Sequence, residues 1–316
     1  MRRKLCVLAG ASLALAALAN ADQSAGAAGS IDSGAPVIST DVNLVVLHAT
    51  VRNRKGEFVS GLAQDNFKVF ENGEQQTIRL FRHEDVPVAA GLIVDSSGSM
   101  GPKRRSVVAG ATEFARHSNP QDRLFVFDFN ERVYSTLPHA QMFTSNVADL
   151  EQAILAAPAT GRTALYDGIM AGYQRLAHAG LDKKALIVIS DGGDNASRVT
   201  LKKLLDRALQ SNVIVYTIGI FDQDDPDRNP GVLKRIARAT GGEAYFPQAL
   251  SQVTSICARI AEDIRNQYTI GYAPGNSRMD GTFRRIVVTA TGPRGQKLSV
   301  RTREGYIAAP LSDTAP

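Results

Sequence analysis

The chain has 316 residues, 44% of them hydrophobic and 21% charged, an ordinary globular composition that allows one large domain plus a smaller one. The formal net charge of +5 falls to about +2 once the basic N-terminus is removed. With that near-neutral balance and no nucleic-acid-binding motif, neither DNA nor RNA is an expected partner. Beyond the N-terminus, no stretch is long and apolar enough to cross a bilayer.

The N-terminus has the order of a secretory signal peptide. Three basic residues precede an apolar run over residues 5–18, and Ala19-Asn20-Ala21 offers a small-residue cleavage site after Ala21. The alternative, a transmembrane anchor, is disfavoured because the uncharged run of 15 residues is short for a span of ~20. We therefore expect a signal peptide over residues 1–21 and a mature protein that is periplasmic or extracellular, with no transmembrane segment.

A short leader is followed by a β region. Residues 22–38 are rich in Ala, Gly and Ser, which indicates a flexible leader, and residues 39–84 have the pattern of a β domain. Strands are expected at residues 42–47, 67–70 and 77–81. The last two flank Asn72-Gly73, a strong hairpin signal because both turn residues tolerate positive φ.

After Pro87 the periodicity changes to alternating strands and helices. The apolar runs that predict strands lie at residues 88–94, 124–129, 185–189 and 213–220. The segments that predict helices lie at residues 102–117, 147–156, 166–179, 200–211, 231–239 and 251–265. This order predicts a doubly wound, mostly parallel sheet covered by helices on both faces, over residues 87–265. Pro102 is expected at the start of the first helix and Thr200 at the N-cap of another.

The chain then returns to a β pattern. Strands are expected at residues 268–272, 283–290 and 297–302, with Gly292-Pro293-Arg294-Gly295 as a turn. Neither β flank is long enough for a core of its own. We therefore predict that residues 39–84 and 267–309 pair into one small β domain into which the α/β domain is inserted, followed by a tail over residues 310–316.

Three polar loops are expected at one edge of the α/β sheet. The first strand is followed by Asp95-Ser96-Ser97-Gly98-Ser99, a later loop carries Thr163 just before a helix, and another strand is followed by Asp191. Because ligands bind at the carboxyl ends of the strands in open α/β sheets, Asp95, Ser97, Ser99, Thr163 and Asp191 form a candidate site.

The oxygen donors of these residues suit a hard cation, Mg²⁺ or else Mn²⁺ or Ca²⁺, and the sequence has no Cys/His cluster for zinc. Most of the nearest ligands would be neutral hydroxyls, so the charge of the ion would stay under-neutralised. An open coordination position would then attract a carboxylate from a partner protein. These donors therefore predict metal-dependent binding of an acidic side chain.

This set of residues resembles the metal-ion-dependent adhesion site of von Willebrand factor type A domains, over about residues 87–265. The resemblance implies that the two serines and Thr163 touch the metal, that the aspartates often act through water, and that a ligand carboxylate completes the shell. The flanks at 67–73, 267–272 and 280–284 resemble exported bacterial proteins of a related family typical of Acidobacteria. Arg162 stands where many type A domains have glycine, and would either steer an acidic ligand or slightly repel the cation.

Several other polar features have plainer interpretations. Asp167 and Asp194 are expected to be loop or helix-terminal residues, and the run Lys103-Arg104-Arg105 a solvated helix face. The acidic residues at 222–227 do not fit an EF-hand loop, because the sixth position is Asp227 and not glycine, so a solvated loop is expected. Cys257 shares a helical face with apolar residues and is expected to be a buried thiol.

The function predicted from the sequence is an exported, metal-dependent protein-binding module and not an enzyme. The sequence has no phosphate loop, no dinucleotide-binding motif and no nucleophile elbow. Two alternatives stay open. One is a structural or assembly component of a cell-envelope complex with a vestigial metal site, and the other is a metal-dependent hydrolase. The sequence carries no signal for the oligomeric state or the identity of the partner.

Overall fold

The structure is a computed structural model that describes residues 44–138, 141–221 and 228–309. The expected signal peptide, the leader, the acidic run at 222–227 and the C-terminal tail lie outside the described residues. The chain from Val42 onward forms one compact unit. Within it, the described strands form two sheets, one of eight strands and one of six.

The six-stranded sheet belongs to the α/β region and has the order β10-β9-β8-β5-β6-β7. Its neighbours are parallel except for β7, which is antiparallel to β6. The strands are β5 (Val88–Asp95), β6 (Arg123–Phe129), β7 (Val133–Ser135), β8 (Lys183–Ser190), β9 (Ile214–Gly219) and β10 (Ala244–Tyr245). Every residue of β5 is buried, which is why its sequence is a continuous apolar run and not an alternating one.

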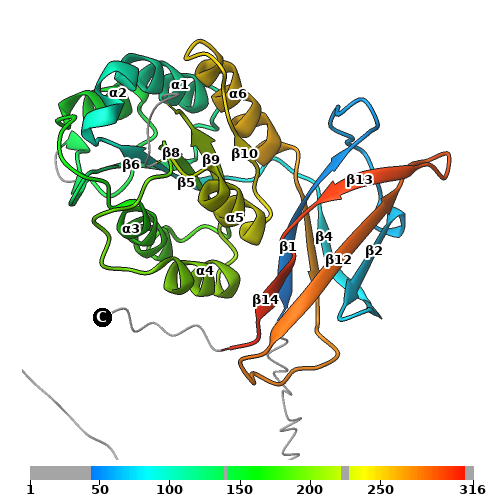
Figure 1. The fold of residues 1–316 in the computed structure, drawn as a ribbon. Coiled ribbons are helices and arrows are strands. Elements are labelled where there is room, and N and C mark those ends of the chain that lie inside the picture. The colour runs from blue at the N-terminus through cyan, green and yellow to red at the C-terminus, as the bar shows by residue number, and fades with distance from the viewer. Residues whose placement is uncertain (1–43, 139–140, 222–227, 310–316) are drawn as a thin grey trace, which may run out of the picture. The chain divides into compact units, whose positions relative to one another are not determined.

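Helices cover both faces of this sheet (Figure 1). On one face lie α1, α2 and α6, and on the other lie α3, α4 and α5. Their bounds are α1 (Arg104–Arg116), α2 (Val147–Ala156), α3 (Leu165–Ala177), α4 (Leu201–Gln210), α5 (Pro230–Thr240) and α6 (Gln252–Arg265). Cys257 of α6 is a buried free thiol, as expected.

The first helix begins later than predicted, whereas the predicted cap at Thr200 is confirmed. Residues Gly98–Lys103, including Pro102, form a 3₁₀ helix, and α1 starts only at Arg104. Two glycines and a proline within six residues disfavour α-helical geometry, so the chain takes the tighter turn first. Thr200 is the N-cap of α4, where its hydroxyl accepts a hydrogen bond from the amide of Lys203.

The eight-stranded sheet contains strands from both β flanks, in the order β3-β2-β12-β13-β1-β11-β4, with β14 also on β12. The first flank supplies β1 (Val45–Arg52), β2 (Phe67–Glu71), β3 (Glu74–Gln76) and β4 (Ile78–Arg82). The second supplies β11 (Tyr268–Tyr272), β12 (Phe283–Thr291), β13 (Lys297–Arg301) and β14 (Gly305–Ile307). Strand β1 pairs with both β11 and β13, and one apolar core contains residues of both flanks, including Leu47, Val69, Ile270 and Ile286.

The hairpin at Asn72-Gly73 forms, but with a different second strand from the predicted one. Both turn residues have positive φ, 50° and 91°, and β2 pairs with β3 in the register Glu71↔Glu74. A two-residue turn requires that immediate register, so the short polar β3 takes the place expected for residues 77–81. Strand β4 leaves the hairpin and pairs with β11, where Phe81 packs against the ring of Tyr268.

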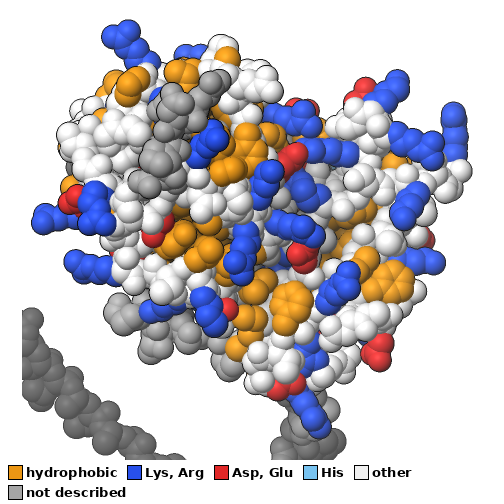
Figure 2. All heavy atoms as spheres, in the orientation of Figure 1, with side chains coloured by type: hydrophobic (Ala, Val, Ile, Leu, Met, Phe, Trp, Pro, Cys, Tyr) orange, Lys and Arg blue, Asp and Glu red, His pale blue; other side chains and the backbone are white. Residues whose placement is uncertain are grey.

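Basic side chains are prominent on one face of the described structure. Figure 2 shows Lys and Arg side chains as the main charged groups on the face in view, with hydrophobic side chains between them. Among the described residues, no helix has the length and apolar character needed to cross a membrane.

Candidate metal centre

The carboxyl ends of two neighbouring strands place the predicted aspartates at one edge of the six-stranded sheet. Strands β5 and β8 are parallel, with Val94 opposite Ile189. Asp95 is the last residue of β5, and Asp191 directly follows the end of β8. Both carboxylates are buried. This edge is where open α/β sheets bind ligands.

Hydrogen bonds join four of the five predicted residues. Asp95 accepts at Oδ1 from the amide of Ser97, at 2.8 Å, and at Oδ2 from the hydroxyl of Ser190, at 2.6 Å. The hydroxyl of Ser99 donates to Oδ2 of Asp191 at 2.7 Å and lies 3.2 Å from the hydroxyl of Ser97. The two loops therefore share one hydrogen-bonded network of carboxylates and hydroxyls.

The loop of Thr163 lies against both of the other loops through its backbone. The amide of Thr160 donates to the carbonyl of Ser96 at 2.9 Å, which joins this loop to the first. The amide of Thr163 donates to Oδ1 of Asn195 at 2.9 Å, and the amide of Asn195 donates back to the carbonyl of Thr163 at 3.0 Å. Thr163 is therefore placed between the other two loops, and Asn195 is a positioning residue that the sequence did not single out.

Glycine is required in the third loop by close packing. Gly192 has φ +83°, and a Cβ there would lie 2.6 Å from the carbonyl oxygen of Asn229. Asn229 caps α5 and donates its amide to the carbonyl of Asp191 at 3.2 Å. The loop that carries Asp191 is thus held against the start of α5, which only a residue without a side chain allows.

The electrostatics of the site favour a cation. The pKa of Asp95 is raised to about 6, mainly by burial and also by the nearby charge of Asp191, against the opposing effect of hydrogen bonds from Ser190 and Ser97. Two buried carboxylates with hydroxyl neighbours form a donor set made only of oxygen, which fits a hard divalent cation. In the described part of the chain, no three or more His, Cys, Asp or Glu side chains come together as metal ligands. An ion here would therefore depend on hydroxyls as well as on the two aspartates.

The prediction of a solvated basic run at residues 103–105 is wrong for two of its three members. Lys103 is only 3% exposed and donates to the carbonyl of Ile220 at 3.1 Å, and Arg104 pairs with the buried Asp128. Only Arg105 is exposed. Asp128 stands between two phenylalanines in a buried strand, and a carboxylate in such a place needs a partner. The position of Asp128 between two phenylalanines is therefore the sequence signal from which the ion pair could have been predicted.

The remaining polar residues near the site act on loop structure. The carboxylate of Asp167 accepts from the amides of Arg198 and Val199, and Asp194 accepts from the hydroxyl of Ser197 at 2.6 Å. Both aspartates are therefore loop and helix-terminal residues, as expected. The guanidinium of Arg162 donates to the carbonyl of Asn195. Arg162 thus joins the second and third loops.

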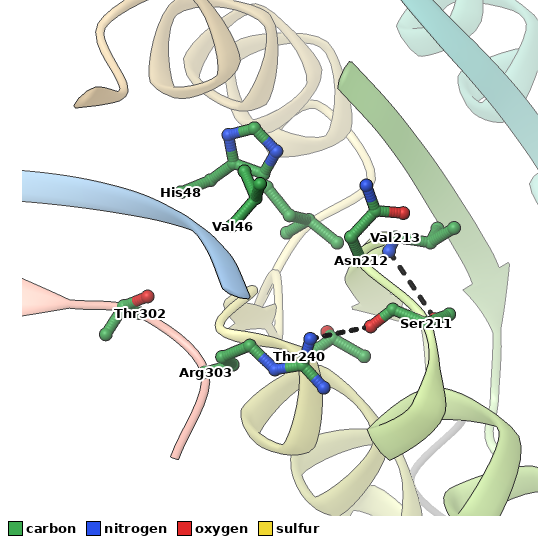
Figure 3. A pocket seen from close by; sticks show the side chains of 9 residues that line it. Val46, His48, Ser211, Asn212, Val213, Thr240, Thr302 and Arg303 are labelled. Carbon is green, nitrogen blue, oxygen red and sulfur yellow. Dashed lines mark hydrogen bonds between the residues drawn. The ribbon is translucent and has the colours of Figure 1, made fainter. Parts of the chain in front are cut away.

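A separate small pocket of about 230 Å³, including open solvent, lies beside the start of β9 (Figure 3). His48, Arg303 and Thr302 are among its lining residues, and no carboxylate is. Two buried polar atoms there, Nε2 of His48 and the hydroxyl of Thr302, have no hydrogen-bond partner. Polar atoms of this kind suit ordered water, so the lining of this pocket fits water molecules and not a metal ion.

The parallel sheet, its helices on both faces and the three polar loops at one edge define an α/β protein with an oxygen-lined ligand edge. Residues 91–259, more than half of the chain, match the family model of the von Willebrand factor type A domain, and the chain belongs to that family. Domains of this family are typically protein-binding modules, and some hold a divalent cation at a metal-ion-dependent adhesion site.

One relative and two solved structures that resemble this chain each match part of it. An uncharacterised protein of Synechocystis sp. is 26% identical over 184 residues, which are 57% of this chain and 42% of that protein. A von Willebrand factor type A structure from Catenulispora acidiphila has a TM-score of 0.50 and 14% identity, covering 70% of this chain and 66% of that one. Proximal thread matrix protein 1 from the mussel byssus, with a zinc-occupied metal-ion-dependent adhesion motif, has a TM-score of 0.51 and 15% identity, covering 61% and 49%. At these identities the two structures show the fold alone.

Proposed function

We propose that this protein is an exported, metal-dependent protein-binding module that captures a carboxylate of its partner at a divalent cation. The observation that carries the proposal is the network in which Ser99 joins Asp191 and Ser97, beside Asp95. We further propose that residues 87–265 form the type A domain and that 39–84 and 267–309 form a single β domain around it.

The proposed ligands of the cation are Asp95, Ser97, Ser99, Thr163 and Asp191. Mg²⁺ is the preferred ion, with Mn²⁺ or Ca²⁺ as substitutes, because all the donors are hard oxygens. Because the direct ligands would be neutral hydroxyls and the aspartates would act at longer range, the charge of the cation would stay under-neutralised at its open position and attract an acidic side chain. Ser97, Ser99 and Thr163 would hold the ion directly, and the two aspartates would orient these hydroxyls and contribute negative charge.

Isothermal titration of Mg²⁺ and Mn²⁺ into the mature protein tests the site. We expect saturable binding by the wild type and none by Asp95→Ala or Thr163→Ala, because each variant loses a donor group. Asp206→Ala is the matched control, since Asp206 lies on α4 in a solvent-exposed pair with Lys202, away from the metal loops, and the variant should keep wild-type affinity. Absence of binding by a folded wild type would contradict the proposal.

Capture of an acidic partner is tested separately. A surface coated with a glutamate-containing peptide should retain the wild-type protein in Mg²⁺ and release it when a chelator is added. The same peptide with glutamine in place of glutamate is the control. Retention that survives chelation would favour a structural role without the metal, and retention by the glutamine peptide would contradict carboxylate recognition.

A further inference from the structure

We propose that the buried ion pair of Arg104 and Asp128 positions the metal loop, by fixing Ser96 between the proposed ligands Asp95 and Ser97, and so sets the affinity for the cation. This inference rests on the proposed metal-binding function. It assigns a role to two residues that do not themselves belong to the ligand set.

The three side chains form a closed triangle of hydrogen bonds. Asp128 lies in β6, directly beside β5, and its side chain is 0% exposed. Its Oδ1 accepts from the hydroxyl of Ser96 at 3.0 Å and from Nη2 of Arg104 at 3.1 Å. Nη1 of Arg104 also donates to the hydroxyl of Ser96, at 3.3 Å. The hydroxyl of Ser96 is therefore held from two sides.

The ion pair is itself anchored to other elements. The hydroxyl of Thr136, next to β7, donates to Oδ2 of Asp128 at 3.1 Å, and Arg104 also donates to the carbonyl of Ile154 in α2. Because these bonds come from separate parts of the α/β fold, neither member of the pair is free to change its rotamer alone. The triangle of hydrogen bonds therefore holds the hydroxyl of Ser96 in one position relative to β6, β7 and α2.

Ser96 transmits this constraint to both of its neighbours. Its amide donates to the carbonyl of Phe129 at 2.7 Å, and its carbonyl accepts from the amide of Thr160 at 2.9 Å. With its hydroxyl held by the ion pair, every polar group of Ser96 is bonded. The backbone position of Ser96 therefore determines the positions of its chain neighbours Asp95 and Ser97, two of the proposed metal ligands.

The cost of burial argues that this pair does more than stabilise the fold. Taking two charges out of water is costly, and apolar residues of similar size often stabilise a core as well or better. Positioning a neighbouring group, by contrast, uses the directional hydrogen bonds that charged side chains make. Residues that orient metal ligands typically change metal affinity by about 10–100-fold when they are replaced. A buried ion pair bonded to the metal loop has that arrangement.

The test compares Asp128→Asn and Arg104→Lys with the wild type by Mn²⁺ titration, thermal unfolding and hydrogen exchange of the metal-free protein. We expect the dissociation constant to rise about tenfold or more. We also expect faster exchange at the amides of Ser97 and Gly98 without metal, which reports loop position independently of binding. If Asp128→Asn does not fold, Arg104→Lys decides, because it keeps the positive charge and loses the two-nitrogen geometry.

Asp263→Asn is the matched control, since Asp263 is equally buried and ion-paired but contacts Arg301 and Thr50, outside the metal loops. It should lower the thermal midpoint and leave the Mn²⁺ affinity unchanged. If folded Asp128→Asn or Arg104→Lys keeps both the Mn²⁺ affinity and the hydrogen exchange of the wild type, the inference is overturned and the proposed function is not affected. No Mn²⁺ binding by the wild type would overturn the proposed function and this inference with it. An equal loss of affinity in Asp263→Asn would show a general stability effect and would also overturn the inference.

Discussion

At the scale of single residues, burial decides the protonation state of His48. Its imidazole lies in β1, and its pKa falls from the ordinary value of 6.5 to about 3, mainly through burial and also through the positive charges of Lys183 and Arg303. The folded protein therefore holds a neutral imidazole where the unfolded chain binds a proton below about pH 6.5. The stability that depends on this neutral form is present above that pH and is lost as the pH falls toward 3.

Replacing His48 by glutamine should reduce the sensitivity of the protein to acid. Between about pH 7 and about pH 4.5, we expect the free energy of unfolding of the wild type to fall by about 2 kcal/mol more than that of His48→Gln, because glutamine has no proton to gain. Urea unfolding at the two pH values measures the difference. An identical decrease in both proteins would contradict the lowered pKa.

At the scale of elements, the end of α5 shows how a helix terminus is shaped by what packs on it. The helix ends at Thr240, and Gly241 follows in the left-handed conformation with φ +80°. A side chain at Gly241 would overlap the backbone at Thr302 and Arg303, which passes close by. Glycine is therefore required at this position for two reasons, the left-handed backbone angle and the close approach of another segment.

The two requirements at Gly241 can be separated with Gly56, which has φ +82° but no atom within 4 Å of its added Cβ. We expect Gly56→Ala to lower the free energy of unfolding by about 1 kcal/mol, from the backbone angle alone. Gly241→Ala should cost at least about 2 kcal/mol more, because the neighbouring backbone must move. Chemical unfolding of both variants gives the comparison, and equal losses would show that the packing at Gly241 is easily relieved.

At the scale of the whole molecule, buried ion pairs join α6 to the eight-stranded sheet. Asp263 of α6 is 0% exposed, accepts from the hydroxyl of Thr50 in β1 at 2.7 Å, and pairs with Arg301 of β13. Arg52 of β1 lies 4.0 Å from the same carboxylate and pairs more closely with Glu243, at 3.0 Å. The helix that leads into β11 is therefore held by charged groups of two other strands of the same sheet.

Neutralising Asp263 should be costly, because it leaves Arg301 without its buried partner. We expect Asp263→Asn to lower the free energy of unfolding by about 3 kcal/mol or more. Asp206→Asn, which breaks the solvent-exposed pair with Lys202, should change it by less than about 1 kcal/mol. Thermal and chemical unfolding of the two variants test this contrast, and similar small losses in both would show that the second acidic partner of Arg301, Glu243 at 3.7 Å, is sufficient.

Local pattern was sufficient for most of the secondary structure. The apolar runs that become β5, β6, β8 and β9 are surrounded on both faces, so their hydrophobicity is visible without knowledge of their neighbours. Strands β7, β10 and β14 were not predicted, because two or three residues are too few to show a period. The partner of the Asn72-Gly73 hairpin was predicted wrongly, because strand propensity at residues 77–81 does not say which strand they pair with.

The sequence by itself determined the alternation of strands and helices, the family to which the chain belongs, and the loops that carry Asp95, Ser97, Ser99, Thr163 and Asp191. These features depend on residues that are close along the chain, where periodicity and spacing are direct signals. Only the tertiary structure showed that Arg104 pairs with Asp128, that Asn195 holds Thr163, and that Asp263 meets Arg301. A lone charged residue has the same local pattern whether it faces water or a partner 24 to 38 residues away, and only the folded chain brings the partner within hydrogen-bond distance.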